Sequence, residues 1–126
     1  MTAKILIAED KDDSRRLIRS MLEIYRYDVV EAENGADAVE RSLAEDPDVI
    51  LMDLAMPVMD GVEATKNIRG HLALRQTPII CLTAYGDLYA DDARKAGAND
   101  VMRKPIDFRE LDPLITRYVR NCRRLQ

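Results

Sequence analysis

The sequence predicts a doubly wound α/β domain, a parallel sheet of five strands covered by helices on both faces. Short apolar runs alternate along the chain with segments whose apolar residues recur at the helical period. Short turns join these segments, and the chain contains neither repeats nor low-complexity stretches. Strands that helices bury on both faces are apolar throughout, as these runs are. We expect one domain over residues 1–126, with strand order 2-1-3-4-5.

The expected strands are short and end in polar residues. They occupy residues 4–8, 28–32, 49–52, 78–82 and 98–102. The run 49–52 is apolar at every position, which predicts the buried centre of the sheet.

Helical periods fill the intervals between the strands. The first helix has Asp12 or Asp13 placed to cap its start, and the second follows the Asn34-Gly35 turn. The third is expected over 62–72 and the fourth over 88–96, with Gly97 as its C-cap. The apolar positions of the first helix are Leu17, Ile18, Met21, Leu22 and Tyr25. Those of the fifth are Leu111, Leu114, Ile115, Tyr118, Val119 and Cys122.

Composition excludes several classes of protein. The 126 residues are 47% hydrophobic and 33% charged, without an apolar run of the ~20 residues that a membrane span needs. Acidic Glu9 and Asp10 follow the first apolar run, where a signal peptide would need a small-residue cleavage site. Cys81 and Cys122 lie in apolar patterns, which predicts buried free thiols. We therefore expect a cytoplasmic protein.

The charge pattern argues for protein partners. A net charge of -4 argues against nonspecific binding to nucleic acid, which depends on neutralising phosphates. Arg117, Arg120 and Arg124 share one face of the fifth helix. We favour a solvated face that complements the helix dipole, and a docking patch for an acidic partner is the alternative.

Polar residues follow four of the expected strands. Glu9 and Asp10 end the first, Asp53 the third, Thr83 the fourth, and Lys104 the fifth. In open parallel sheets ligands bind beyond the carboxyl ends of the strands, so these side chains should share one crevice. Three carboxylates brought together repel one another unless a cation neutralises them. Oxygen ligands of this kind suit Mg²⁺ or Mn²⁺.

Asp53 is the best candidate for a nucleophile, because it ends the central strand inside the acidic cluster. A carboxylate beside Mg²⁺ can attack phosphorus, since the metal shields the approaching charges. Lys104 can pair with the phosphoryl charge, and the Thr83 hydroxyl can donate to a phosphoryl oxygen. Taken singly, each of these residues is more simply explained by a structural role, as a helix cap, a turn residue or a surface cation. Only the whole set predicts phosphoryl chemistry.

The chain resembles the receiver domains of two-component response regulators, the family of the chemotaxis protein CheY. The resemblance runs from about residue 4 to 118. Its motifs are Ile7-Ala8-Glu9-Asp10, the stretch from Leu51 to Gly61, Leu82-Thr83-Ala84, Gly97-Ala98-Asn99-Asp100 and Lys104-Pro105.

This resemblance implies the flavodoxin-like (βα)5 receiver fold and a phosphorylation-dependent switch rather than an enzyme. Asp53 would accept a phosphoryl group from a histidine kinase or a histidine phosphotransfer protein. Asp10 would bind the metal directly and Glu9 mostly through water, with the Ala55 backbone carbonyl as a further ligand. The target would be a protein on the surface of the fourth helix, fifth strand and fifth helix. We expect no output domain and no contact with nucleic acid or membrane.

Three positions depart from the family pattern. Val101 stands where the family usually carries a switching aromatic residue, so we expect the signal to pass from Thr83 through residues 84–86 to the fourth helix. Ala55 and Tyr85 occupy the two positions that tune hydrolysis of the acyl phosphate in the family.

Other functions are weaker fits to the residues. A degenerate receiver acting as a constitutive binding module is compatible with Val101, whereas the intact acidic set argues against it. A haloacid-dehalogenase-like phosphatase expects a second Asp where Ala55 stands. A flavodoxin or Rossmann nucleotide-binding domain expects a glycine-rich phosphate loop, which the sequence lacks.

Overall fold

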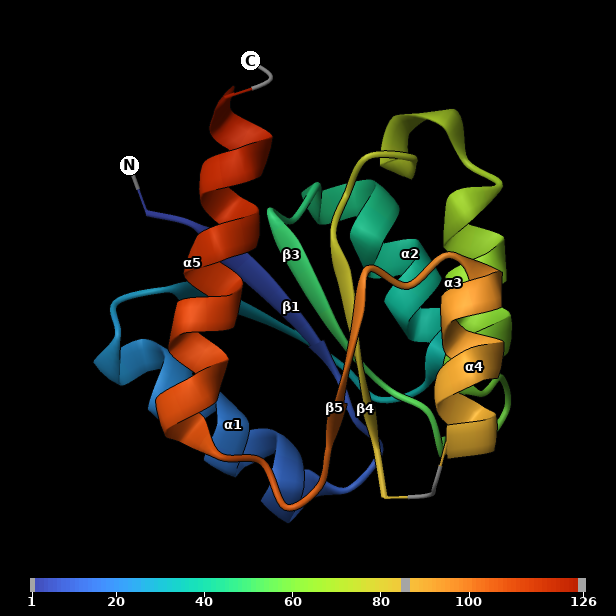
Figure 1. Ribbon diagram of the computed structural model, residues 1–126, viewed down its shortest axis with the longest axis horizontal. Helices are drawn as coiled ribbons and strands as arrows, with labels where there is room; N and C mark the ends of the chain where they lie inside the picture. The colour runs from blue at the N-terminus through green and yellow to red at the C-terminus, as the bar shows by residue number, and fades with distance from the viewer. Residues whose placement is uncertain (1, 85–86, 125–126) are drawn as a thin grey trace.

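The structure is a computed structural model that describes residues 2–84 and 87–124, with side chains at 2–84 and 89–119. Five strands form one parallel sheet, with α1 and α5 on one face and α2, α3 and α4 on the other (Figure 1). The strands are β1 (Lys4–Ala8), β2 (Asp28–Ala32), β3 (Val49–Asp53), β4 (Ile79–Thr83) and β5 (Asp100–Arg103). The helices are α1 (Asp12–Ile24), α2 (Gly35–Glu45), α3 (Gly61–Arg69), the 3₁₀ turn η1 (Leu72–Leu74), α4 (Asp87–Ala96) and α5 (Phe108–Arg124).

The sheet order is β2-β1-β3-β4-β5, which confirms the predicted fold class and strand order. Every residue of β3 is buried, as expected for the centre of a sheet covered on both faces. Alternate residues of the strands supply two separate cores. Leu6 and Ile50 pack with α2, α3 and α4, whereas Ile7 and Leu51 pack with α1 and α5.

The start of α1 differs from the prediction that Asp12 or Asp13 caps it. Lys11 is the N-cap residue and makes no side-chain cap hydrogen bond. Asp12 and Asp13 lie in the first turn, where negative charge still favours the positive end of the helix dipole. The Asp12 carboxylate is directed to Arg15 instead, with 2.6 Å between Oδ1 and Nη2. The Asp12 carboxylate, which could have accepted a hydrogen bond from the start of the helix backbone, therefore accepts one from Arg15.

Only some of the apolar residues predicted for the core face of α1 are buried. Ile18 and Leu22 are buried, while Leu17 is 56% exposed and Tyr25 41% exposed. The predicted core face of α5 is confirmed for Leu111, Ile115 and Val119, with Leu114 and Tyr118 partly buried. The side chains of Arg120, Cys122 and Arg124 lie outside the described residues.

Two predicted boundaries were wrong by two or more residues. Helix α3 ends at Arg69 rather than residue 72, because the chain turns at Gly70 and η1 follows as a separate turn. Strand β5 begins at Asp100 rather than residue 98, because the preceding residues complete the end of α4. Gly97 adopts φ 119°, as its predicted role of C-cap requires, and the Ala98 N–H donates to the Ala93 carbonyl.

Cys81 is a free, buried thiol, as predicted. Burial is the main reason that its pKa is raised to about 11. None of the helices in the described part of the chain is long and apolar enough to span a membrane.

Gly61 packs directly against the backbone at the end of β3, which leaves no room for a side chain. A Cβ there would overlap the Asp53 carbonyl oxygen and lie 2.8 Å from Leu54 Cα, so Gly61→Ala should destabilise the protein by about 2 kcal/mol. Gly70→Ala is the matched control. At Gly70 the φ is -73° and the nearest atom is 3.3 Å away, so its stability should change by less than about 0.5 kcal/mol. Urea unfolding of both variants measures the difference. Equal stabilities would show that the loop after β3 shifts enough to accommodate the added methyl group.

Candidate functional site

The topology brings the ends of β1, β3, β4 and β5 to one edge of the sheet. Strands β1 and β4 lie on either side of β3, and their registers place Ala8 opposite Met52 and Leu82 opposite Asp53. Glu9 and Thr83 each lie one residue beyond these pairs. The predicted crevice is therefore centred on Asp53, with β5 one strand further away.

Three carboxylates meet there. Glu9, Asp10 and Asp53 each offer a carboxylate oxygen, and these oxygens lie within 4.8 Å of one another. The side chain of Glu9 is fully buried and that of Asp53 is 4% exposed. Carboxylates this close and this dehydrated repel one another strongly. Such a group requires a cation.

Lys104 supplies one positive charge from the end of β5. Its Nζ lies 3.1 Å from Glu9 Oε2 and 3.1 Å from Asp53 Oδ1. Burial opposes the Lys104 charge, but the fields and hydrogen bonds of Asp53 and Glu9 outweigh it and raise the Lys104 pKa. Burial, followed by the neighbouring Asp53, raises the pKa of Glu9, and Lys104 only partly offsets both. One cation is thus too few for the cluster.

Asp10 carries the clearest mark of an additional ligand. Its Oδ1 is buried and has no hydrogen-bond partner among the described residues. An unpartnered buried carboxylate oxygen is costly, whereas the same oxygen is a suitable ligand for a hard divalent cation. The residues present therefore fit a metal at the cluster.

Ala55 lies in the loop between β3 and α3, directly beyond Leu54. The Gly61 N–H donates to the Leu54 carbonyl at 3.1 Å, and Asp60 caps α3 through the Glu63 N–H. A hollow of about 180 Å³ borders this loop, lined by Leu54, Ala55, Met56, Asp60 and Tyr89. The loop is anchored at both ends, and Ala55 itself is exposed.

Thr83 is 1% exposed at the end of β4. Its carbonyl oxygen accepts a hydrogen bond of 2.8 Å from the Lys104 N–H, which fixes the backbone of β5 where the Lys104 side chain leaves it. The Lys104–Pro105 peptide bond is cis.

A second, apolar hollow of about 400 Å³ adjoins the site. It is lined by Ser14, Leu17, Ile18, Lys104, Pro105, Ile106 and Phe108. Lys104 belongs to both the hollow and the acidic cluster, so a molecule in the hollow would lie beside the carboxylates.

Sequence reasoning missed two residues that the structure places at or near the site. Leu17, expected to be a core position, lines the apolar hollow. Arg15, which carried no prediction, is buried and contacts the backbone of Glu9. Its spacing of three residues from Asp12 was the available signal, because such pairs face each other on a helix.

Comparison with known proteins agrees with this geometry. The family model described as the response regulator receiver domain matches residues 5–116. The receiver domain of a sensor histidine kinase from Pseudomonas aeruginosa PAO1 has a TM-score of 0.89 at 34% identity, covering 94% of this chain and 98% of that one. That structure holds a magnesium ion coordinated in its active site cleft. The chemotaxis protein CheY4 of Vibrio cholerae has a TM-score of 0.88 at 28% identity, covering 94% and 99%.

Curated relatives are longer than this chain. The regulatory protein AtoC of Escherichia coli K12 is 38% identical over 93% of the chain and 26% of its own length. The transcriptional regulatory protein SrrA of Staphylococcus aureus strain NCTC 8325 is 38% identical over 88% of the chain and 45% of its own length. The chain thus spans less than half of these relatives. Because one of them regulates transcription, the exclusion of nucleic acid that we drew from net charge is not supported.

Lys104 should compete with any divalent cation for Glu9 and Asp53, so Lys104→Met should have opposite effects on stability and on Mg²⁺ affinity. Without divalent cations the variant should lose about 2 kcal/mol of stability, because Glu9 and Asp53 lose their partner. Its affinity for Mg²⁺ should nevertheless rise, since the competing charge is gone. Urea unfolding and an NMR titration with Mg²⁺ measure the two effects. Lys66→Met, at an exposed position on α3, is the control. Weaker Mg²⁺ binding in Lys104→Met would contradict competition.

Proposed function

The chain belongs to the receiver domains of response regulators, which are signalling switches, and we propose that Asp53 is its phosphoacceptor. The observation that carries the proposal is the buried Asp53 carboxylate, held within 4.8 Å of two other carboxylates and 3.1 Å from the Lys104 ammonium group. No other described carboxylate combines this position at the end of the central strand with a cation partner from β5.

The chemistry is transfer of a phosphoryl group from a phosphohistidine of a kinase or phosphotransfer protein. A carboxylate oxygen of Asp53 attacks phosphorus, an O–P bond forms as the N–P bond breaks, and the departing imidazole nitrogen takes a proton from solvent. Lys104 exchanges its contact with Asp53 for one with the incoming phosphoryl oxygens. The Thr83 hydroxyl donates to another of these oxygens. The protein thereby assists its own modification, as expected of a switch rather than an enzyme that acts on other molecules.

Asp10, Glu9, Asp53 and the Ala55 backbone carbonyl would hold Mg²⁺ or Mn²⁺. When bound, the cation supplies the positive charge that lets a phosphoryl group approach three carboxylates. The unpartnered Asp10 oxygen and the net negative charge of the cluster support this assignment. The magnesium ion in the related Pseudomonas aeruginosa receiver domain supports it by analogy.

The phosphoryl donor would dock over the apolar hollow beside Lys104. Leu17 lines this hollow and is 56% exposed, whereas its neighbour Ile18 on the same helix is buried in the core. A partner protein could therefore cover Leu17. A protein that covers Leu17 and Phe108 would bring its phosphohistidine to the acidic cluster and exclude water from it. We place this encounter in the cytoplasm, where a free thiol such as Cys81 stays reduced.

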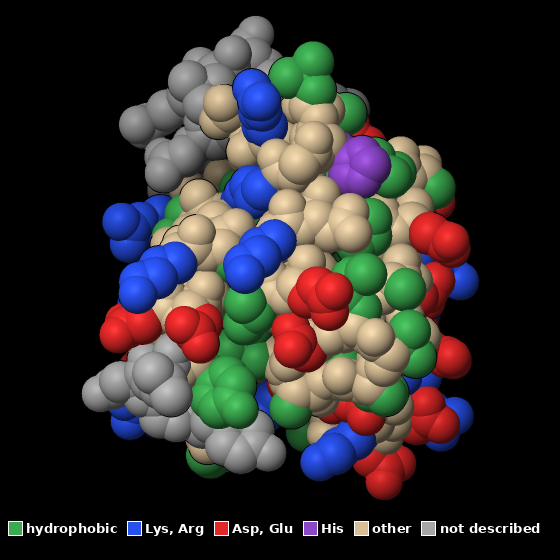
Figure 2. Space-filling view, turned by 90° about the vertical axis from the view of Figure 1, so that its right-hand side faces the viewer, with side chains coloured by type: hydrophobic (Ala, Val, Ile, Leu, Met, Phe, Trp, Pro, Cys, Tyr) green, Lys and Arg blue, Asp and Glu red, His purple; other side chains and the backbone are tan. Residues whose placement is uncertain are grey.

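The signal would leave through α4, β5 and α5. Tyr89 of α4 lines the hollow at the β3–α3 loop, so a shift of the loop that carries Ala55 reaches α4 directly. On the face formed by α3 and α4, hydrophobic side chains lie between acidic ones in the lower half of Figure 2. Val101 is partly buried and packs against the core on this side of the sheet, which suits a passive role. The route through Tyr85 and Gly86 falls outside the described residues and stays a prediction.

Two rival functions lack comparable support. The constitutive binding module predicts a decayed acidic site, but the carboxylates and Lys104 are assembled. The phosphatase expects a second acid where Ala55 lies. The first experiment below tests the constitutive binding module, which should gain no mass from acetyl phosphate.

Asp53→Asn should abolish phosphorylation. Incubation with acetyl phosphate and Mg²⁺, followed by intact-mass measurement, should show one added phosphoryl group on the wild type and none on the variant. Asp60→Asn is the matched control, because it removes a nearby carboxylate while an amide oxygen can still cap α3. It should be labelled like the wild type. A full mass gain in Asp53→Asn, or none in the wild type, would refute the assignment.

Leu17→Glu should separate donor docking from chemistry. The variant should be labelled normally by acetyl phosphate, because Leu17 lines the apolar hollow and is not one of the residues of the acidic cluster. Transfer from a phosphorylated kinase or phosphotransfer protein that labels the wild type should slow by about tenfold, the loss of roughly 1.4 kcal/mol of contact. Leu72→Glu, at a position 78% exposed on η1, is the control and should leave both rates unchanged. Equal rates of protein-to-protein transfer in the wild type and Leu17→Glu would place the donor elsewhere.

A further inference from the structure

Arg15 is a buried cation that the phosphoryl chemistry does not use. It lies in α1 one turn after Asp12, and only 7% of its surface is exposed. Buried arginines are rare unless their charge and their donors find partners. The side chain must therefore be held by specific contacts.

Three groups hold the guanidinium. Its Nη2 lies 2.6 Å from Asp12 Oδ1, its Nε 3.1 Å from Glu31 Oε1 on β2, and its Nη1 donates to the Glu9 carbonyl oxygen at 2.9 Å. Burial tends to lower the Arg15 pKa, but Asp12 and Glu31 outweigh it and raise that pKa. Arg15 therefore stays charged.

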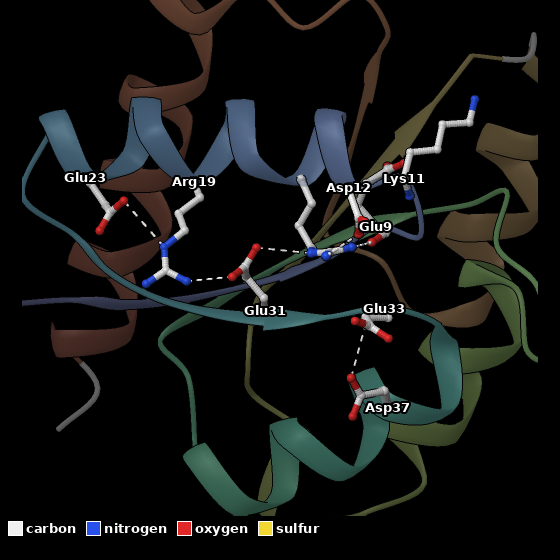
Figure 3. Close-up of polar contacts among 9 residues, drawn as sticks. Glu9, Lys11, Asp12, Arg19, Glu23, Glu31, Glu33 and Asp37 are labelled. Atoms are coloured by element: carbon white, nitrogen blue, oxygen red, sulfur yellow. Dashed lines mark hydrogen bonds and ion pairs between the residues drawn. The ribbon is translucent and has the colours of Figure 1, made fainter.

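Arg15 belongs to a longer chain of charges between α1 and β2, because its partner Glu31 also contacts Arg19. Figure 3 shows Glu31, Arg19 and Glu23 of this chain. Glu31 also accepts from Arg19 at 2.6 Å, and Arg19 lies 3.4 Å from Glu23. Arg15 and Arg19 both contact Glu31, and Arg15 also donates to the Glu9 carbonyl in the segment between β1 and α1. Arg19 thus shares the electrostatics of Arg15 but not its contact with Glu9.

Arg15 contacts Glu9 at the point where the chain leaves the sheet, just beyond the end of β1. The pairing of β1 with β2 ends at Ala8 and Ala32, and the Glu9 N–H still donates to the Ala32 carbonyl at 3.1 Å. The Glu9 carbonyl lies beyond this last sheet contact and takes its hydrogen bond from Arg15. That carbonyl belongs to the planar peptide group that joins Glu9 to Asp10. Arg15 thereby orients the link between two residues of the acidic cluster.

We propose that Arg15 is a positioning residue that presets the Glu9–Asp10 peptide group, so that both carboxylates are arranged for a divalent cation before it binds. Asp12 and Glu31 neutralise the guanidinium, so its effect on the metal comes through the backbone rather than through charge. The inference rests on the proposed function insofar as the acidic cluster is the metal site. Groups that orient metal ligands typically change metal affinity by roughly 10-fold to 100-fold when removed.

The test compares Arg15→Gln with Arg19→Gln. Each variant removes one positive charge from Glu31, and only the first removes the donor to the Glu9 carbonyl. An NMR titration with Mg²⁺, without any phosphoryl donor, gives the affinity. Arg15→Gln should bind Mg²⁺ roughly tenfold more weakly, and Arg19→Gln should stay within about twofold of the wild type. Asp10→Asn, which alters a proposed ligand, gives the response of a damaged site.

Labelling with acetyl phosphate supplies a second measurement. Because Arg15 touches no reacting atom, saturating Mg²⁺ should return Arg15→Gln to the wild-type rate, whereas a distorted site would keep a low maximal rate. Urea unfolding shows whether each variant is folded. If Arg15→Gln does not fold, Arg15→Lys replaces it, since Lys keeps the charge but cannot reproduce the three contacts of the guanidinium. It should also bind Mg²⁺ more weakly.

Three results would overturn the proposal: wild-type Mg²⁺ affinity in the folded Arg15 variant, an equal loss in Arg19→Gln, or a rate that saturating Mg²⁺ does not restore. Failure of the proposed function looks different. In that case the wild type binds Mg²⁺ but gains no mass from acetyl phosphate, while the ratio of Mg²⁺ affinities still decides the role of Arg15.

Discussion

The repulsion among Glu9, Asp10 and Asp53 is the constraint around which this molecule is organised. Three carboxylates within 4.8 Å of one another persist only because the surrounding structure holds them there. Strands β1 and β3 are buried and paired in register up to the residue before the cluster, so the carboxylates cannot retreat into solvent. Lys104 offsets part of the repulsion, and Asp10 keeps a buried oxygen without a hydrogen-bond partner among the described residues. The remaining negative charge favours the binding of a cation at the cluster.

The centre of the sheet is buried, whereas the loops at its carboxyl edge are more exposed. Strands β3 and β4 are buried throughout and β1 nearly so, whereas the loop with Ala55 and the hollow beside Tyr89 lie at the rim. Two cores lie below this rim, one on each face of the sheet, so α2, α3 and α4 pack in a different core from α1 and α5.

Particular elements show where sequence reasoning succeeds and where it stops. Strand β3 was predictable because burial on both faces leaves an uninterrupted apolar run. Leu17 was misjudged because helical periodicity marks an apolar face but not its buried width, which depends on how closely α5 approaches α1. The cap of α1 was misjudged because Asp12 had two possible partners, the helix backbone and Arg15, and only the folded geometry chooses between them.

Hydrophobic period and strand-end chemistry are properties of short segments, so the fold class, the family resemblance and the residues that gather at the strand ends could be predicted before the structure was known. The strand order followed from the same alternation of strands and helices. Tertiary structure alone decided the distances among the carboxylates, the two contacts of Lys104 and the orphaned oxygen of Asp10. It also decided that Arg15, ordinary in the sequence, reaches the Glu9 carbonyl. The cluster and the Lys104 contacts depend on how the ends of β1, β3 and β5 lie in the sheet, and the Arg15 contact depends on how α1 packs beside β1. A buried polar contact between segments leaves no periodic pattern in the chain.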